Sequence, residues 1–385
     1  MRHLNTVFHD VLKLVPWTTF DKLVDEHGTD DLVRRLTTRQ QFLALLFGQL
    51  SGASSLRDLT TSMESHRGRL YHCGATAPKR STLADANKIR DAGVFAKLFQ
   101  TLLASQRRGL RRKMTDAVRL IDSTSLRLAG VGAEWARFSA HVCGAKAHIV
   151  FDPDAQTPIY HEISAANVND VSVAKPMPIE EGATYVFDLG YYDYAWWAQL
   201  DDAGCRIVTR FKANTPLVDE RSRAGSIEGS DILSDRIGFL PERQAASRRN
   251  PMRVAIREIV VRARSGKPLR LLTNDLDASA REIADLYKRR WDIELFFRLM
   301  KQTLRITKFL GRSENAVRIQ IAVALIAHLL LGALRKQCEG EISHLQLVRL
   351  IRVNLMHRKE AARLKVDRPK PPLDSRQLSL ALQYA

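Results

Sequence analysis

One short segment of this chain combines several side chains that could act together in catalysis. The residues from Tyr287 to Lys301 read YKRRWDIELFFRLMK. At about 100° per residue on a helix, Tyr287, Arg290, Glu294 and Lys301 fall within about 60° of each other. The segment therefore predicts a helix that holds one carboxylate among groups able to bind phosphate.

The other side of this predicted helix is apolar, which indicates that it is buried. Its residues are Leu286, Ile293, Phe296, Phe297 and Met300. An amphipathic helix in which Arg290 and Arg298 simply neutralise Glu294 at a spacing of four residues would explain the same pattern. A metal-binding role for Glu294 therefore requires partner carboxylates elsewhere in the chain.

Two aspartates in predicted strands supply such partners. Residues 117–124 read AVRLIDST and residues 184–191 read TYVFDLGY, so that each segment predicts a short strand ending in an aspartate, Asp122 or Asp188. Ligands gather at the carboxyl ends of strands in open α/β sheets, although an aspartate there is more often a turn former. Together with Glu294, these aspartates could hold two Mg²⁺ ions, which clamp the attacking and leaving oxygens of a phosphodiester.

The elements expected around these carboxylates are typical of a mixed α/β domain. Strands are predicted over residues 117–124, 146–152, 159–164, 184–188 and 206–211, and a helix over 194–203. Residues 153–156 form the turn of a hairpin between the second and third strands. Three antiparallel strands followed by alternating helix and strand are what a ribonuclease H-like core requires.

The remaining segments divide the chain into four predicted parts. Thr38 and Ser81 are expected to cap helices of an all-α first part, whereas glycines and prolines punctuate short strands over 254–263 and 269–273 in a β-rich insertion. Helices resume after Gly311. The predicted boundaries are 1–112 for a helical N-terminal DNA-binding domain, 113–211 with 275–335 for the catalytic domain, 212–274 for the β-rich insertion, and 336–385 for C-terminal helices and a basic tail.

The charge of the chain indicates a polyanionic partner. Its 385 residues carry a formal net charge of +18. Basic residues cluster at Arg107, Arg108, Arg111, Arg112 and Lys113, and again at Arg243, Arg248, Arg249, Arg253, Arg257, Arg262, Arg264, Lys267 and Arg270. Solvated surface charge or a membrane-surface or ribosomal preference gives similar clusters, but beside three carboxylates they predict a channel for a phosphate backbone. The first part could contain a helix-turn-helix DNA reader or be a small packing domain.

Cysteines and hydropathy indicate a cytoplasmic protein. The four cysteines form no C-x-x-C pair, which argues against a zinc ribbon or disulfide framework and favours a reducing compartment. The first five residues contain no apolar signal core. The longest apolar run, 321–334, is short for a bilayer and contains His328, so it predicts a buried helix. We therefore expect a cytoplasmic protein with no membrane partner.

The order of Asp122, Asp188 and Glu294, with Y-x2-R-x3-E-x6-K around the glutamate, resembles the DDE transposases of the insertion-sequence-four family of bacteria. The resemblance runs from about Arg119 to Gly311 and includes the motifs IDST, FDLGY, VTRFK and LYKRRWDIELFFRLMK. Near the start of the chain, RHLNTVFHDVLKLVP and KRSTLADAN also resemble the helical N-terminal region of one branch of that family.

The resemblance implies a bacterial, nucleoid-associated cut-and-paste transposase with a ribonuclease H-like catalytic domain. Its two Mg²⁺ ions, or Mn²⁺ as a substitute, would be bound by Asp122, Asp188 and Glu294, and DNA phosphates by Tyr287, Arg290 and Lys301. The implied partners are the double-stranded DNA of the transposon ends and of the target, held by a homodimer in a synaptic complex. Cleavage would pass through a hairpin on the transposon end. The alternatives are a two-metal nuclease without strand transfer and an inactive DNA-binding relic that acts as a repressor.

Overall fold

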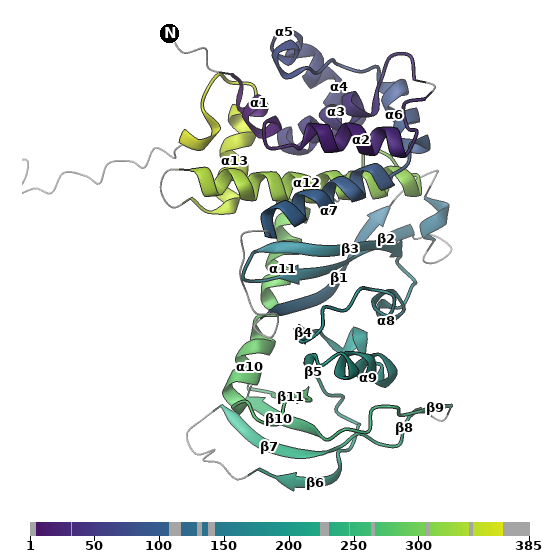
Figure 1. Ribbon diagram of the computed structural model, residues 1–385, viewed down its shortest axis with the longest axis vertical. Helices are drawn as coiled ribbons and strands as arrows, with labels where there is room; N and C mark the ends of the chain where they lie inside the picture. Colours follow the sequence, from purple (N-terminus) through teal and green to yellow (C-terminus); the bar gives the residue numbers. More distant parts are fainter. Residues whose placement is uncertain are drawn as a thin grey trace, which may run out of the picture.

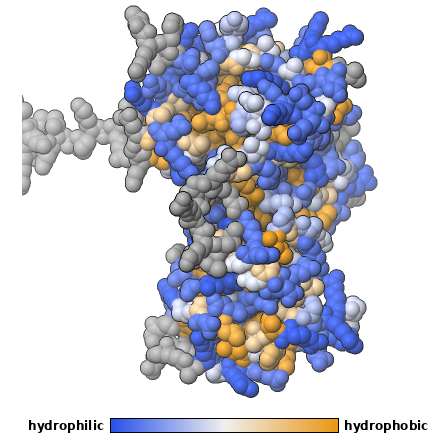
Figure 2. All heavy atoms as spheres, in the orientation of Figure 1, coloured by the Kyte–Doolittle hydropathy of each residue, from blue (hydrophilic) through white to orange (hydrophobic). Residues whose placement is uncertain are grey.

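A mixed sheet, covered at one end by a block of helices, forms the frame of the protein (Figure 1). The computed structural model describes residues 5–31, 33–107, 117–128, 133–137, 143–223, 231–245, 247–262, 266–304, 306, 308–338 and 342–364. On the face drawn in Figure 2, hydrophilic residues predominate, and hydrophobic residues show only in small groups. The basic tail and residues 108–113 of the first basic cluster lie outside the described residues.

The N-terminal helices pack against helices that follow the catalytic segment. The first seven are α1 (Val7–Leu12), α2 (Trp17–Glu26), α3 (Thr38–Ser51), α4 (Leu56–Ser65), α5 (Arg67–Leu70), α6 (Arg80–Ile89) and α7 (Gly93–Arg107). Two more, α12 (Glu314–Gln337) and α13 (His344–Asn354), complete the block. Helix α12 contacts α3, α6 and α7, and 83% of its most apolar window is buried, which agrees with the predicted buried helix.

Both predicted helix caps were misplaced by one or two positions. Thr37 caps α3, because its hydroxyl accepts a hydrogen bond from the backbone N–H of Gln40. Thr38 is instead the first helical residue, and its hydroxyl donates to Asp30 at 2.8 Å. Helix α6 begins at Arg80 after Lys79, and no side chain caps it. Thr37 and Thr38 have the same side chain at adjacent positions, so the local sequence does not show which of them caps the helix. The hydrogen bond of Thr38 to Asp30 in the folded chain makes the difference.

The first five strands have the predicted ribonuclease H-like arrangement. They are β1 (Val118–Leu128), β2 (Cys143–Asp152), β3 (Thr157–Ala165), β4 (Thr184–Val186) and β5 (Arg206–Arg210), in the sheet order β3-β2-β1-β4-β5. Strands β1, β2 and β3 are antiparallel, whereas β4 and β5 run parallel to β1. Helices α8 (Asp170–Ala174) and α9 (Tyr194–Asp202) precede and follow β4.

The segment between β5 and the Glu294 helix is rich in strands, and four of these strands extend the same sheet. They are β6 (Val218–Ser222), β7 (Ile232–Phe239), β8 (Arg243–Ala245), β9 (Arg248–Arg249), β10 (Ile256–Arg262) and β11 (Pro268–Thr273). Strand β11 pairs antiparallel with β5, and β10, β7 and β6 follow in order, while β8 and β9 form a separate ribbon. The edge of β5 is thereby covered by hydrogen bonding.

The helix predicted from Tyr287 to Lys301 is not continuous. The chain forms α10 (Ala280–Lys288), a turn, α11 (Trp291–Arg298) and a π-helical turn over Leu299–Thr303. Helix α10 contacts β5, β7, β10 and β11, whereas α11 contacts β1. The break thus separates the part of the helix that packs on the insertion strands from the part that packs on β1. The periodicity of the sequence does not contain this information.

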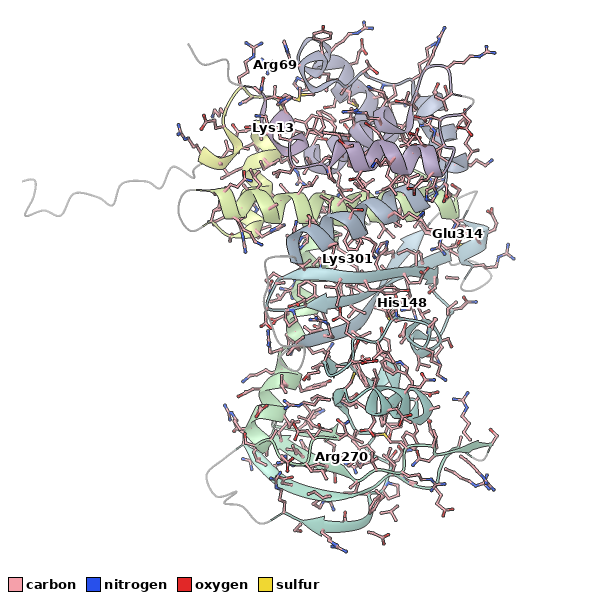
Figure 3. All side chains as sticks on the ribbon, viewed as in Figure 1. Lys13, Arg69, His148, Arg270, Lys301 and Glu314 are labelled. Carbon is pink, nitrogen blue, oxygen red and sulfur yellow. The ribbon has the colours of Figure 1, made fainter. Side chains whose placement is uncertain are left out.

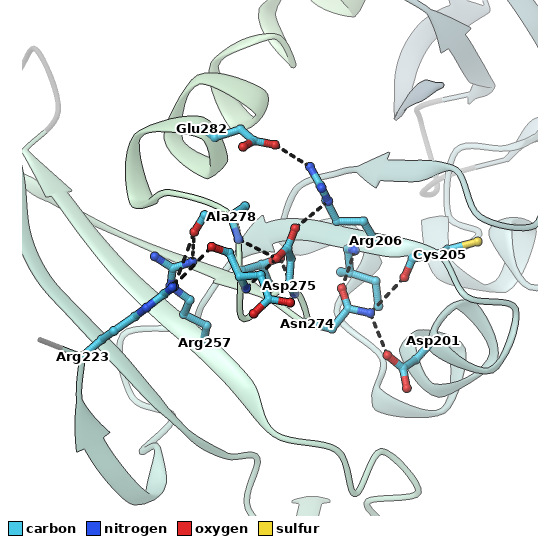
Figure 4. Close-up of polar contacts among 12 residues, drawn as sticks. Asp201, Cys205, Arg206, Arg223, Arg257, Asn274, Asp275, Ala278 and Glu282 are labelled. Atoms are coloured by element: carbon cyan, nitrogen blue, oxygen red, sulfur yellow. Dashed lines mark hydrogen bonds and ion pairs between the residues drawn. The ribbon is translucent and has the colours of Figure 1, made fainter. Parts of the chain in front are cut away.

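A polar network fixes the start of α10 (Figure 4). The side chain of Asn274 accepts a hydrogen bond from the Ile207 backbone N–H at 2.7 Å and donates to the Cys205 carbonyl at 2.9 Å. Asp275 pairs with Arg206 at 2.8 Å and accepts from the backbone N–H of Ala278 at 2.9 Å. The helix that leads to Glu294 is therefore anchored to the end of α9 and the beginning of β5.

Candidate active site

Asp122 on β1 lies level with Asp188, which follows the end of the neighbouring parallel strand β4 and caps the 3-10 turn Leu189–Tyr191. Leu120 of β1 pairs with Val186 of β4, so Asp122 and Asp188 are each two residues beyond this pair. Asp122 was predicted at the end of its strand, but β1 continues to Leu128 because β2 pairs with it along that whole length. The register of β1 with β4, and not the end of β1, places the two carboxylates together.

Helix α11 brings Glu294 to the same place. Asp122, Asp188 and Glu294 line one cleft of about 440 Å³, together with Arg290 and Lys301. Arg298, predicted on the same helical stripe, also lines this cleft. Figure 3 labels Lys301 at the end of the helix, beside the first three strands. The apolar side is buried as expected, with Ile293, Phe296, Phe297 and Met300 all less than 8% exposed.

Tyr287 lies beside this cleft rather than in it. It lines a second groove, of about 760 Å³, between α10 and the insertion strands, and Arg290 lines both. The guanidinium carbon of Arg290 is 5.9 Å from the centroid of the Tyr287 ring. Of the six predicted site residues, five thus share one cleft, and Tyr287 contacts it through Arg290.

Arg290 lies between two of the carboxylates. Its Nη1 is 3.4 Å from Oδ2 of Asp122, and its Nη2 is 2.6 Å from Oε1 of Glu294. The arginine Nε is buried and makes no hydrogen bond within the described residues. Arg290 therefore does pair with Glu294, as expected for a simple amphipathic helix. This pair, however, lies inside a cleft that also contains Asp122 and Asp188.

The environment of the cleft disfavours charge on Asp122. Burial raises the pKa of Asp122 to about 6, and repulsion from Asp188 and Glu294 adds to the effect, whereas the Ser123 N–H and Arg290 oppose it. Burial also lowers the pKa of Lys301. A raised carboxyl pKa and a lowered lysine pKa are both expected where charged groups lie in a recess, and such groups cluster at functional sites.

The three carboxylates have the chemistry of a divalent-cation site. Carboxylate oxygens are hard ligands of the kind that Mg²⁺ prefers. As the side chains stand, no three His, Cys, Asp or Glu side chains among the described residues are close enough together to hold a metal ion. Arg290 lies between Asp122 and Glu294 and contacts both. The donor set fits the ion, provided that Arg290 moves away from these carboxylates.

Backbone and side-chain contacts that the motif analysis missed orient the two aspartates. The Gly190 N–H donates to Asp188 at 2.8 Å, and the Ser123 N–H donates to Asp122 at 2.8 Å. A Cβ atom on Gly190 would lie 3.0 Å from the Asp188 carboxylate and 3.1 Å from that of Asp170. Only glycine fits there without moving a carboxylate.

Asp170 is a fourth carboxylate beside this site. It accepts a hydrogen bond from the Ser123 hydroxyl at 3.0 Å and pairs with Lys146 at 2.9 Å. Ser123 lies opposite His148 in the β1–β2 ladder, and Nδ1 of His148 is 3.7 Å from Asp170. The sequence predicted the strand that carries Lys146 and His148, but neither its pairing with β1 nor the position of α8 followed from the sequence.

Several arginines of the predicted DNA channel are neutralised within the protein. Arg257 forms a two-point ion pair with Asp235, with both distances 2.7 Å, and Arg270 pairs with Glu258. Arg248 approaches Asp193 at 3.7 Å. Arg264 lies outside the described residues. The arginines paired on β10 and β11 therefore stabilise the insertion, and they balance only part of the local positive charge.

Comparison with known sequences identifies the family. Residues 113–330 match the family described as Transposase DDE domain, and residues 3–76 match a domain of unknown function (DUF4372). The chain belongs to the DDE transposase family. A putative transposase, y4zB, of Sinorhizobium fredii is 37% identical over 298 residues, which cover 77% of this chain and 82% of that protein. The transposase is thus a phosphoryl-transfer enzyme of insertion sequences, a family that generally uses divalent metal ions.

Two further similarities extend over most of the transposase. A probable transposase for insertion sequence element IS5377 of Geobacillus stearothermophilus is 27% identical over 349 residues, which cover 88% of each chain. A cryo-EM structure of the piggyBac transposase synaptic complex with hairpin DNA aligns with a TM-score of 0.49 at 11% identity, covering 99% of this chain and 85% of that chain.

Proposed function

We propose that this transposase binds the terminal inverted repeats of its own insertion sequence, cleaves the DNA at these ends and inserts the element into a target. The observation that carries the proposal is the convergence of Asp122, Asp188 and Glu294 on one cleft with Arg290 and Lys301. Three carboxylates and three cationic side chains in one recess match the requirements of phosphodiester displacement, in which the charges of the metal ions and of the phosphate must both be balanced.

The carboxylates and the cations have separate tasks in this proposal. Asp122, Asp188 and Glu294 hold two Mg²⁺ ions, for which Mn²⁺ is a substitute; when bound, the ions activate the attacking water or 3′-hydroxyl and stabilise the leaving oxygen. Arg290 and Lys301 bind the phosphates beside the scissile bond, and Tyr287 supports Arg290 from the neighbouring groove. Arginine and lysine side chains only donate hydrogen bonds, so they bind phosphate and not metal.

The reaction follows a cut-and-paste course through a hairpin on the transposon end. Two copies of the chain hold two ends in a synaptic complex, and the enzyme works at the nucleoid in the bacterial cytoplasm. No covalent bond between protein and DNA is formed in this scheme. A two-metal nuclease with the same carboxylates would release cleaved ends without joining them to target DNA.

The test compares isosteric variants of the three carboxylates in the full chain. Asp122→Asn, Asp188→Asn and Glu294→Gln should each abolish Mg²⁺-dependent cleavage of labelled element ends, while binding of the same DNA persists. Glu162→Gln, a substitution of a half-buried carboxylate outside the cleft, is the matched control and should cleave normally. Substantial cleavage by any triad variant would remove that residue from the metal site. Cleavage by the unmodified chain without strand transfer would favour the nuclease.

A further inference from the structure

A second basic surface lies on the helical block, away from the carboxylate cleft. It is a groove of about 650 Å³ between α4, α6 and the segment 309–313 that precedes α12. Figure 1 shows α4 and α6 on the same side of the block as the beginning of α12. Four basic side chains line it, namely Arg57, Arg80, Lys88 and Arg312. We call the groove that these residues line the helical-block groove.

None of these four cations is neutralised by a carboxylate of the described residues, and no carboxylate of those residues lines the groove. Of the acidic residues nearest in sequence, Asp85 of α6 does not line the groove, and Asp58 and Glu314 are engaged elsewhere. Asp58 accepts a hydrogen bond from the Ser54 backbone N–H at 2.8 Å, and Glu314 pairs with Arg318 at 2.9 Å. This contrasts with Arg257 and Arg270 of the insertion, which pair with carboxylates. The groove therefore retains a net positive charge.

Helix N-termini add to the positive potential of the groove. Helices α4 and α12, of 10 and 24 residues, begin beside Ser55 and Ser313, and both serines line the groove. Arg80, the first residue of α6, lines it as well. The N-terminal end of a helix carries about half a positive charge and unpaired N–H groups, which favour phosphate.

The groove is held rigidly to α12 and is linked to the catalytic helix. Gln320 of α12 accepts a hydrogen bond from the Leu310 N–H at 2.8 Å and donates to the Lys308 carbonyl at 2.9 Å. These two bonds fix the segment that carries Arg312. That segment follows the π-helical turn that bears Lys301, so the groove and the carboxylate cleft lie at the two ends of one short stretch of chain.

We propose that the helical-block groove binds the phosphate backbone of double-stranded DNA that enters the enzyme. The inference rests on the proposed function and names a surface that holds the substrate. Four cations from three segments exceed what a single free phosphate needs, whereas a duplex presents one charge per about 1.7 Å. Contacts of this kind position the duplex and do not read its sequence.

The test replaces the four cations together in the full chain, as Arg57→Gln, Arg80→Gln, Lys88→Gln and Arg312→Gln. The matched control removes four exposed cations from other surfaces, as Lys22→Gln, Lys336→Gln, Arg349→Gln and Lys359→Gln. Fluorescence anisotropy gives the Kd for an element-end duplex and for a scrambled duplex over a series of salt concentrations. The thermal midpoint of each variant confirms folding, and a single Arg312→Gln variant provides an independent measurement.

The groove variant should lower the slope of log Kd against log salt by about 2 to 4, since each lost phosphate contact removes about 0.9. The loss should be equal for both duplexes, Arg312→Gln should lower the slope by about 1, and the control should keep the slope of the unmodified chain. Equal slopes for the groove variant and the unmodified chain, or an equal loss in the control, would overturn the inference.

Cleavage separates failure of the groove from failure of the proposed function. In low salt and with protein in excess, the groove variant should still cleave bound element ends, because the carboxylate cleft is unchanged. If the unmodified chain cleaves and the groove variant keeps its salt dependence, only the inference about the groove is wrong. If the unmodified chain binds but never cleaves, the proposed function fails, while the slopes still decide whether the groove binds DNA.

Discussion

Nη2 of Arg290 lies 2.6 Å from Oε1 of Glu294, one turn further along the chain. The same guanidinium reaches Asp122 at 3.4 Å. In the DNA-free arrangement, Arg290 thus balances two of the carboxylates that we assign to metal binding. Divalent cations held by those carboxylates would compete with the guanidinium, and its five N–H donors would then be available to a phosphate in the same cleft.

Replacement of Arg290 should impair positioning of the DNA and leave the metal ligands in place. We expect Arg290→Ala to slow cleavage by about a hundredfold, since a misplacement of about 1 Å has such an effect. Arg290→Lys should recover only part of the rate, because an ammonium lacks the two-point geometry. The measurement is single-turnover cleavage of intact and of pre-nicked ends, with Lys22→Ala as control. Normal rates for Arg290→Ala on both substrates would show that Arg290 only neutralises Glu294.

Gly190 should be required for the position of Asp188. A methyl group at this position would lie 3.0 Å from the Asp188 carboxylate, closer than ordinary van der Waals contact. We expect Gly190→Ala to slow cleavage about tenfold or more by displacing that carboxylate. Gly332→Ala on α12 is the control, because its Cβ meets nothing within 4 Å and alanine favours a helix. Equal cleavage rates for the two variants would contradict the proposed position of Asp188.

Asn274 should contribute measurably to folding stability. Its side chain bonds to the Ile207 N–H, the Cys205 carbonyl and the Asp201 carboxylate, all within 2.9 Å. Asn274→Ala leaves these groups unpaired, which costs about 1 to 3 kcal/mol. Urea denaturation measures this free energy of unfolding. Asn354→Ala removes one hydrogen bond to the Leu350 carbonyl within the same helix, so it should lower the free energy of unfolding by less than Asn274→Ala does. A larger loss for Asn354→Ala would disprove the anchoring role of Asn274.

Folding stability should fall on acidification below about pH 6.5. Burial lowers the pKa of His148, His161 and His328 to about 4 and that of His344 to about 2. Between these values and the ordinary pKa near 6.5, the unfolded chain binds more protons than the folded chain, so the free energy of unfolding decreases as pH decreases. Each of these histidines should lower the free energy of unfolding by about 1 kcal/mol as the pH falls from 7.5 to 5.5.

The raised pKa of Asp122 acts in the opposite direction. Its folded carboxyl group, with a pKa of about 6, takes up a proton before the unfolded one, so it stabilises the folded chain as pH falls from about 6 to 4. One such group offsets only part of the effect of four histidines. Urea denaturation at pH 7.5 and 5.5 measures the sum, and His328→Gln should reduce the difference between the two. A stability that rises on acidification would contradict the buried, neutral state of these imidazoles.

Local patterns in the sequence were enough to predict the order of the elements and to indicate the candidate site residues. The β1, β2 and β3 hairpins, the following alternation of helix and strand, and the buried α12 all follow from local hydrophobic patterns and turn residues, which operate over a few positions. The spacing of Tyr287, Arg290, Glu294 and Lys301 indicated a shared face without the structure. This spacing survives the helix break because Arg289 and Arg290 keep right-handed helical backbone angles, and Arg290, Glu294 and Lys301 meet in one cleft.

The packing of the folded chain sets which residues meet across the sheet and which charged side chains lack a partner of opposite charge. The pairing of Leu120 with Val186 sets Asp122 beside Asp188, although nothing in either segment specifies a register with the other. Arg257 reads as a DNA-binding residue in the sequence, yet it pairs with Asp235, 22 positions away. The groove around Arg57 and Arg312 likewise depends on the packing of α4 and α6 beside α12. Such contacts join segments far apart in the chain, so they are determined by packing of whole elements and not by local pattern.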